Sequence, residues 1–185
     1  MRVVGIGGTL RAGSSSERLG RAVLAACEVR GASVRMFDGP HLAQLPHFDP
    51  AMPDRSPAEA ELVEAVRTAD ALVIASPGYH GGVSGLVKNA IDLLEDLRGD
   101  ARPYFDGRPV GLIVSAAGWQ AGGVTLAALR GIVHAMRGWP TPIGLAVNSI
   151  EQKPFDAEGN LAETGISAAV EAMADQLMQG VRPGA

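Results

Sequence analysis

A short segment near the N-terminus gathers side chains suited to binding an anion. Thr9, Ser14, Ser15 and Ser16 offer hydroxyl groups, and Arg11 offers a planar guanidinium that matches the geometry of a phosphate. The segment follows an apolar run and precedes a helical pattern. It therefore ends at a predicted helix N-terminus, where free N–H groups and the helix dipole favour negative charge. These residue types and their spacing predict a site for a phosphate monoester.

Two well-known phosphate loops do not fit this segment. Gly8 and Gly13 have the spacing of a P-loop, but Ser14 stands where that motif requires lysine. A dinucleotide-binding fingerprint fails because Leu10 occupies the position of its third glycine. The alternative interpretation is a serine-rich turn that caps a helix, although one serine would suffice for a cap.

Two later segments combine glycine with planar side chains. Glycine lets a backbone approach a flat ligand closely, and Tyr79 and His80 supply flat rings, unless they are exposed loop residues without a role. Trp119 suits the other edge of such a ligand or a contact between subunits. The candidate residues of the two segments are Pro77, Gly78, Tyr79, His80 and Gly81, followed by Ser115, Ala116, Ala117 and Gly118.

The elements that must position these segments are strands and helices in alternation. Unbroken apolar runs predict strands at 3–7, 32–37, 71–75, 109–115 and 143–147. Helical spacing of apolar residues predicts helices at 18–30, 58–68, 83–97, 121–136 and 165–178. Such a chain forms a doubly wound parallel sheet, and ligands bind beyond the carboxyl ends of its strands. We expect a long loop at 40–57 and a mobile polar segment at 151–163.

Composition excludes several classes of protein. The 185 residues fit a single domain, 1–185, and the net charge of −4 argues against a nucleic-acid binder. The single cysteine, Cys27, excludes a disulfide within the chain and indicates a packed thiol. Since no window approaches the ~18 apolar residues of a membrane span, we expect a cytoplasmic protein that does not bind membranes. No metal site is predicted.

The three loops together resemble the NADPH-dependent FMN reductase family. The first loop of that family, roughly Gly-Ser-x-Arg-x-x-Ser, is matched by residues 8–14 with threonine in place of serine. Its second loop, roughly Pro-x-Tyr-Asn-Gly-x-x-x-Gly-x-Leu-Lys-Asn-Ala-Ile-Asp, differs here at His80 and Val87. The likeness covers about residues 3–147. The matching positions of the second loop are Pro77, Tyr79, Gly81, Gly85, Lys88, Asn89, Ala90, Ile91 and Asp92.

The resemblance implies a fold, a cofactor and roles for the loops. The fold would be a flavodoxin-like three-layer sandwich with a five-stranded parallel sheet in the order 2-1-3-4-5. Thr9, Arg11, Ser14 and Ser16 would hold the phosphate of FMN, helped by the amide of Ser15. Residues 77–81 would line one edge of the isoalloxazine, with a backbone amide near N5, and residues 115–118 would approach its pyrimidine end. The substitution of His80 for asparagine would alter the shape and polarity of one pocket wall.

The resemblance also implies a function. Hydride would pass from NADPH or NADH to FMN, so no catalytic side chain is expected, because the cofactor carries the reaction. The favoured hypothesis is a reductase that releases reduced FMN to a flavin-dependent monooxygenase. The alternatives are a reductase of quinones, azo dyes or metal oxyanions that keeps its FMN, a flavodoxin-type electron carrier, and a flavin-free anion-binding module. We expect a homodimer or homotetramer, as is common in the family.

Overall fold

Five parallel strands form the centre of the molecule, in the order β2-β1-β3-β5-β6. This computed structural model describes residues 1–180, so residues 181–185 of the expected domain lie outside the described part. The order confirms the predicted flavodoxin-like topology, counted without β4 (Gly82–Val83), which pairs with β3 alone. The five strands are β1 (Arg2–Gly7), β2 (Ser33–Phe37), β3 (Ala71–Tyr79), β5 (Pro109–Ala116) and β6 (Trp139–Asn148).

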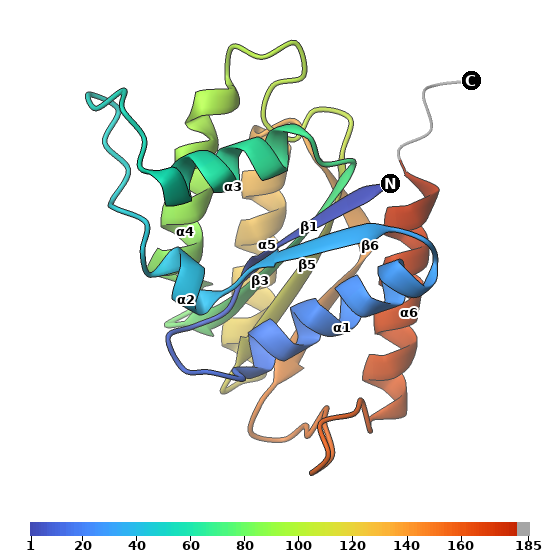
Figure 1. Cartoon of the computed structure of the whole chain (residues 1–185). Helices are drawn as coiled ribbons and strands as arrows, with labels where there is room; N and C mark the ends of the chain where they lie inside the picture. The colour runs from blue at the N-terminus through green and yellow to red at the C-terminus, as the bar shows by residue number, and fades with distance from the viewer. Residues whose placement is uncertain (181–185) are drawn as a thin grey trace.

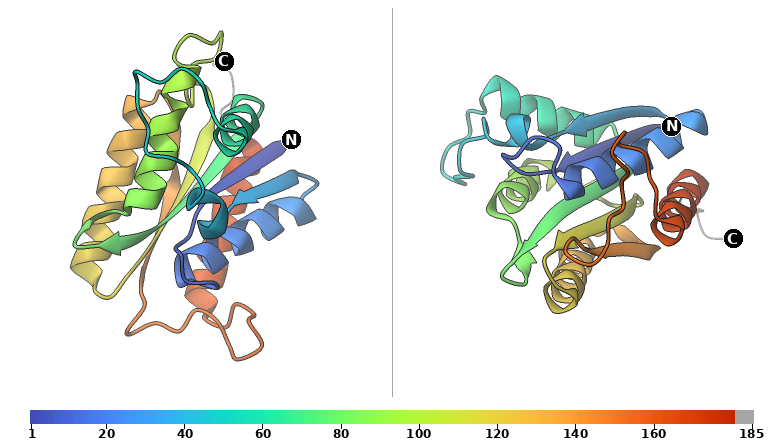
Figure 2. Two further views of the ribbon diagram at one scale, coloured as in Figure 1. Left: turned by 60° about the vertical axis from the view of Figure 1, so that its left-hand side comes forward. Right: turned by 90° about the horizontal axis from the view of Figure 1, so that it is seen from below.

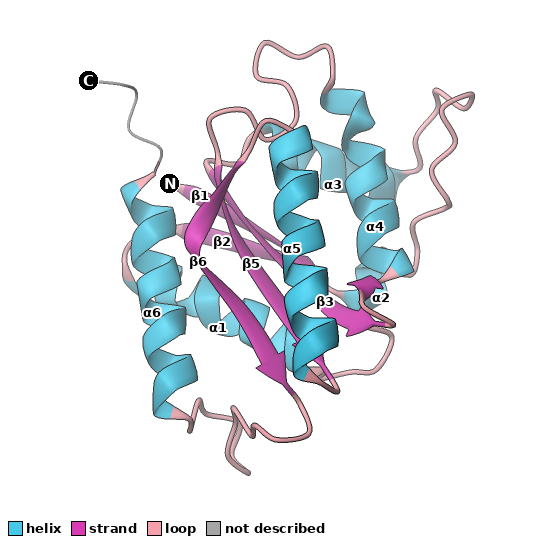
Figure 3. Cartoon of the chain, turned by 180° about the vertical axis from the view of Figure 1, so that it is seen from behind, coloured by secondary structure: helices cyan, strands magenta, loops and turns pink. Residues whose placement is uncertain are grey.

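Helices cover both faces of the sheet, which accounts for the unbroken apolar strands. In β1, Val3 packs with the helices of one face, whereas Val4 and Ile6 pack with those of the other. Figure 1 shows α1 and α6 together on one face, and Figure 3 shows α4 and α5 on the opposite face. The longer helices are α1 (Ser15–Val29), α3 (Pro57–Arg67), α4 (Gly85–Asp92), α5 (Trp119–Ala135) and α6 (Thr164–Gln179).

Several predicted boundaries were wrong: α1 begins at Ser15 rather than at 18, and β6 begins at Trp139 rather than at 143. The backbone explains the differences in two further segments. Strand β3 continues beyond residue 75 to Tyr79, because its last residues pair with β5 on one side and with β4 on the other. The helix expected at 83–97 begins after Ser84, whose hydroxyl accepts a hydrogen bond from the amide of Val87. It ends at Asp92, and a 3-10 turn, η1 (Leu93–Leu97), completes the segment.

The long loop expected at 40–57 is interrupted by a short helix at its beginning. Helix α2 (Gly39–Leu42) starts where the carboxylate of Asp38 accepts a hydrogen bond from the amide of His41 at 3.2 Å. An acidic N-cap followed by Pro40 in the first turn is an ordinary start signal for a helix. The remainder of the loop is fastened to α4, because the Asn89 side chain donates to the Pro46 carbonyl and accepts from the Phe48 amide.

The polar segment at 151–163, whose mobility stays a prediction, contains a turn that contacts α1. Phe155 and Leu161 form an isolated antiparallel bridge, and the turn between them is closed by hydrogen bonds from Asn160 to Asp156. The guanidinium of Arg18 lies 3.9 Å from the centre of the Phe155 ring, a cation–π contact that links the segment to α1. In Figure 2 this orange segment extends beyond the end of the sheet at which β6 terminates.

A fully buried arginine holds together the opposite end of the sheet. Arg108 precedes β5, and its side chain has no exposed surface. Its guanidinium donates to the carbonyls of Ala69 (2.9 Å), Arg67 (2.7 Å) and Tyr104. Burial lowers the pKa of Arg108 to about 10, so the group still carries its charge at neutral pH.

Cys27 is buried on α1, as the sequence predicts. Burial raises the pKa of its thiol to about 11, which makes the thiolate scarce and the residue unreactive at neutral pH. Among residues 1–180, no helix combines the length and the apolar character that a membrane crossing requires.

Candidate functional site

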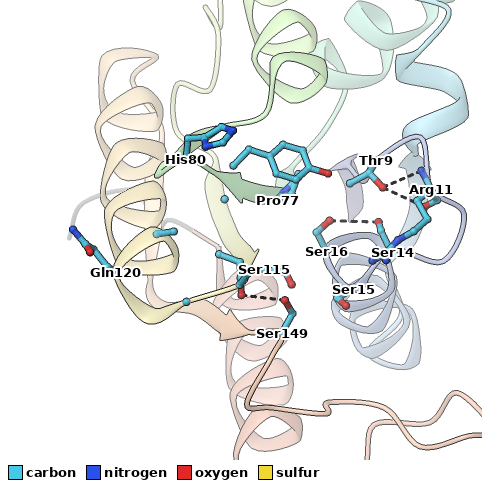
Figure 4. A pocket seen from close by; sticks show the side chains of 16 residues that line it. Thr9, Arg11, Ser14, Ser15, Ser16, Pro77, His80, Ser115, Gln120 and Ser149 are labelled. Carbon is cyan, nitrogen blue, oxygen red and sulfur yellow. Dashed lines mark hydrogen bonds between the residues drawn. The ribbon is translucent and has the colours of Figure 1, made fainter.

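A cavity of about 700 Å³ opens at the carboxyl ends of β1, β3 and β5 (Figure 4). Thirteen of the fourteen predicted site residues line it; Gly81, the next residue in the β3–β4 turn, does not. Three lining residues escaped sequence reasoning. The lining comprises Thr9, Arg11, Ser14, Ser15, Ser16, Pro77, Gly78, Tyr79, His80, Ser115, Ala116, Ala117 and Gly118, with Gln120, Ala121 and Ser149 in addition.

The first loop is held in shape by close contacts with its neighbours. Gly7 has φ +155°, and a Cβ added there would lie 2.0 Å from the Ala75 carbonyl oxygen, so no side chain fits. The Thr9 hydroxyl accepts from the amide of Arg11 at 3.1 Å and lies 3.2 Å from its carbonyl. This turn leaves the Arg11 side chain exposed at the cavity, without an acidic partner among the described residues.

Helix α1 begins in this cavity without a side-chain cap. Ser14 occupies the N-cap position, but its hydroxyl caps no amide and instead lies 3.5 Å from the hydroxyl of Ser16. Both hydroxyls belong to side chains that are 2% exposed. Helix α3, by contrast, has a complete capping box made by Ser56 and Glu59. Within the described residues, the first-turn amides of α1 therefore remain available to an anion.

Two other cations near the first loop are already engaged. Arg21 donates to the buried carboxylate of Glu17 at 2.9 Å and to Asp38 at 2.7 Å, which joins α1 to the end of β2. Arg18 stacks on the Phe155 ring. Arg11 is consequently the cation of this region left to meet a ligand. Sequence reasoning missed the ion-paired Glu17, although its partner Arg21 lies four residues later on the same helix.

The second loop is a tight hairpin, and its backbone geometry explains why a histidine is tolerated at position 80. Tyr79 pairs with Gly82, and the two residues between them, His80 (φ +51°) and Gly81 (φ +76°), both have positive φ. Positive φ at both central positions defines a type I′ turn, which favours Asn-Gly. Histidine, like asparagine, is among the non-glycine residues enriched in this left-handed region. The change from the family asparagine to His80 therefore keeps the backbone and changes the side chain at the pocket rim.

Replacing His80 with valine should lower the free energy of unfolding by about 1–3 kcal/mol, because a β-branched residue is strained at positive φ. Chemical denaturation of the two proteins measures the difference. The variant His80→Asn is the matched control, and its stability should stay within about 0.5 kcal/mol of the parent. Equal stability of the valine variant would contradict the assigned turn.

The third loop is fixed from β6. The Ser149 amide and hydroxyl both donate to the Ala116 carbonyl, at 2.8 and 3.1 Å. Gly118 is the N-cap of α5, so this helix also begins at the cavity without a side-chain cap. Trp119 is 51% exposed and its indole N–H donates to Glu151 at 2.8 Å. Since Trp119 does not line the cavity, the geometry does not support its placement at the edge of a flat ligand.

Three other matched positions of the second loop, Lys88, Asn89 and Asp92, contribute to the structure of α4 and its surroundings. Asn89 fastens the loop at 46–48, and Lys88 pairs with Asp92 at 2.5 Å along the surface of α4. Neither lysine nor asparagine lines the cavity. The motif thus combines residues of the cavity with residues that hold α4 and the long loop together.

Comparison with known proteins gives the family. The model of the NADPH-dependent FMN reductase family matches residues 1–152. The chain belongs to this family. It is accordingly an NAD(P)H-dependent FMN oxidoreductase, with FMN as cofactor and a reduced nicotinamide as co-substrate.

Relatives of this family member include enzymes with different named acceptors. The chain is 32% identical to "Probable NADPH:quinone oxidoreductase 2" of Oryza sativa subsp. japonica, over 94% of this chain and 85% of that protein. It is 31% identical to "FMN-dependent NADPH-azoreductase" of Staphylococcus aureus, over 65% of this chain and 61% of that protein. The solved structure of FerB, a flavoenzyme NAD(P)H:(acceptor) oxidoreductase from Paracoccus denitrificans, matches the fold with a TM-score of 0.71 at 21% identity, covering 97% and 98% of the two chains.

Proposed function

We propose that FMN binds in the 700 Å³ cavity with its phosphate at the first loop. The cavity lies within the range of about 300–1,000 Å³ of small-molecule sites. The observation that carries the proposal is the coincidence, at one end of the cavity, of the uncapped α1 N-terminus, two buried hydroxyls and the free Arg11 guanidinium. A phosphate needs several short hydrogen bonds and a cation, and this end offers both.

The flat part of FMN then lies between the second and third loops. Residues 77–80 form one wall and residues 115–118 the other, with Gln120 and Ala121 at the start of α5 and Ser149 behind the third loop. These walls consist of backbone, small side chains, the Tyr79 and His80 rings and the Gln120 amide. They can hold a planar ring system by packing and by backbone hydrogen bonds.

The residues of the cavity bind and orient rather than react. Bound FMN supplies hydride chemistry, accepting two electrons from a nicotinamide and passing them on. Arg11 and the serines anchor the phosphate, so the ring cannot slide along the cavity. Gly78 lets β3 pack closely against β5 and α5 beside the cavity, because a Cβ there would stand 3.0 Å from the Cβ of Ala116 and 3.1 Å from the hydroxyl of Thr125.

We further propose that FMN stays bound and that a quinone or an azo compound is the final acceptor. The similarity to the rice protein named as a quinone oxidoreductase, which extends over 94% of this chain, supports this acceptor class. The alternative is release of reduced FMN to a flavin-dependent monooxygenase, and the exposed position of Arg11 at the phosphate end favours it.

We also propose that residues 1–180 act as one flavin-binding domain that forms a homodimer. Large apolar side chains are exposed on segments in or next to the cavity lining, and a second copy of the chain would cover them. Sedimentation should therefore give twice the mass of the 19.1 kDa chain; a monomer would contradict the dimer. These side chains are Leu10, Tyr79, Trp119, Val124 and Ile150.

The function is tested by the absorbance spectrum of the purified protein, an FMN titration and NADPH oxidation. A yellow protein that oxidises NADPH rapidly once a quinone is added supports the bound-flavin reductase. A colourless protein whose NADPH oxidation requires added FMN supports the flavin-releasing reductase. Absence of flavin binding under all conditions would overturn the proposal.

Replacing Tyr79 with alanine should weaken FMN binding about 2- to 12-fold, the equivalent of about 0.5–1.5 kcal/mol for an aromatic pair, or change turnover by a similar factor. Fluorescence titration and steady-state rates measure both quantities. Trp139→Ala is the control, since this exposed tryptophan lies at the start of β6, at the opposite end of the sheet. If affinity and turnover both stay at the parental values, Tyr79 does not contact the ring.

A further inference from the structure

The lining of the cavity is poor in groups that exchange protons near neutral pH. Among its sixteen residues, three have ionisable side chains: Arg11, Tyr79 and His80. Arginine stays protonated and tyrosine stays neutral in this range, whereas an imidazole is the side chain that ordinarily changes charge between pH 5 and 8. His80 is therefore the candidate for proton exchange within this lining.

His80 lies at the end of the cavity where an electron acceptor would bind against the FMN ring. Figure 4 shows it at the rim, on the far side of Pro77 from Ser14, Ser15 and Ser16, with Gln120 on the same side of the cavity. With the phosphate at the serines, the ring of FMN and a stacked acceptor extend toward this rim. The side chain is exposed, so water can restore its proton after each turnover.

The charges around this position are few. Its own strand contributes Tyr79, the first loop contributes Arg11, and β4 contributes no ionisable group. From the start of α5 come Gln120 and Ala121, which are uncharged. Glu151, on the segment after β6, is hydrogen-bonded to the Trp119 indole. The lining therefore provides no carboxylate that would replace the imidazole as a proton donor.

Quinone reduction consumes a proton, and a positioned acid delivers it faster than water does. A quinone becomes a hydroquinone by gaining one hydride and one proton, and NAD(P)H supplies the hydride through FMN in the activity of the family. We propose that protonated His80 supplies the proton: an imidazole N–H bond breaks, an O–H bond forms on the carbonyl oxygen that does not receive the hydride, and neutral imidazole remains. This inference rests on the proposed quinone reductase, and asparagine, the family residue at this position, has no proton to give.

The test compares the parent with His80→Asn, which preserves the turn, and with His134→Asn, which removes an exposed histidine from the other end of α5. FMN is titrated into the apoprotein while the imidazole signals are followed by NMR, the His80 signal being the one that is missing from His80→Asn. This signal should shift as FMN binds. FMN binding without a shift would overturn the inference.

The FMN-bound proteins are then reduced with NADPH and reoxidised, without oxygen, by 1,4-benzoquinone or by ferricyanide, which takes electrons without protons. General acids contribute typically ~10²–10⁴-fold, so His80→Asn should lose about 10²-fold in quinone reoxidation and far less in ferricyanide reoxidation. The parental quinone rate should fall with rising pH, because an imidazole donates a proton only while it is protonated, and that of His80→Asn should not. His134→Asn should behave as the parent.

The outcomes separate this inference from the proposed function. An unchanged quinone rate and pH profile in His80→Asn, with NADPH reduction intact, would overturn the role of His80 and leave the reductase in place. An equal loss with both acceptors would also overturn it, since a structural defect would act on both. A parent that binds no FMN would overturn the proposed function and the inference together.

Discussion

Replacing Arg11 with alanine is expected to weaken FMN binding by about 1.5–3 kcal/mol, which corresponds to about 10- to 150-fold in Kd. The guanidinium is exposed at the cavity, and it has no acidic partner among the described residues. Arg18 and Arg21 cannot replace it, because one stacks on Phe155 and the other joins Glu17 to Asp38. Fluorescence titration of the apoprotein with FMN measures the change.

A ligand control isolates the phosphate in this experiment. Riboflavin has the same ring as FMN but no phosphate, so Arg11→Ala should leave its affinity unchanged. The FMN affinity of Arg11→Lys should lie between those of the parent and of Arg11→Ala, because lysine keeps the charge but lacks the planar guanidinium. If FMN binds the alanine variant as tightly as the parent, Arg11 does not contact the phosphate and the assigned orientation of FMN is wrong.

Replacing Arg108 with methionine should lower the free energy of unfolding by about 1–3 kcal/mol, the cost of leaving hydrogen-bond acceptors without their donor. The methionine fills part of the space but donates no hydrogen bond. It thus removes the guanidinium that donates to the carbonyls of Arg67, Ala69 and Tyr104, of which Ala69 alone keeps a second charged donor, Arg102. Denaturant unfolding followed by circular dichroism gives the difference.

The control for this variant is Arg98→Met, since the Arg98 side chain is 77% exposed and forms one ion pair within a helical turn. Its removal should change stability by less than about 1 kcal/mol. A loss of stability of similar size in both variants would mean that the hydrogen bonds of Arg108 stabilise the fold no more than an exposed ion pair does. If Arg108→Met does not fold in cells, the unfolding free energy of Arg108→Lys in urea tests the same hydrogen bonds. Lysine keeps the charge but has fewer donors.

The sequence was sufficient to predict the sheet and most of the cavity lining, because both follow from local rules. Unbroken apolar runs mark strands covered on both faces, and the carboxyl ends of parallel strands meet at one edge. Loops after the first, third and fourth predicted strands therefore had to meet. The first loop could be assigned in detail because Thr9, Arg11 and the serines belong to one contiguous segment.

Features built from distant segments were not predictable in the same way. Ser149 reaches the cavity because β6 ends beside β5, and no local pattern around residue 149 indicates this. Arg108 precedes a proline and resembles a solvated loop residue, although it donates to one carbonyl of its own loop and to two carbonyls near the end of α3. Gln120 could have been found, since it directly follows Gly118 and Trp119 at a predicted helix start.

The turn at His80 illustrates a different limit. The sequence shows a histidine where the family has asparagine, and the pattern alone indicates a changed pocket wall. The backbone angles show that the position first requires a residue tolerant of positive φ. Histidine and asparagine both meet that requirement, so the difference between them is confined to the chemistry of the side chain.

Helices α1 and α5 begin at the cavity without a side-chain cap, so the supply of cofactor should affect the lifetime of the protein. Their unpaired amides are a cost that an anion or a ring oxygen would relieve in the native state but not in the unfolded chain. A ligand present at about 100 times its Kd adds about 2.7 kcal/mol to the unfolding free energy. In a flavin-starved cell the empty protein would unfold more often and be degraded sooner, so its abundance would follow the concentration of FMN.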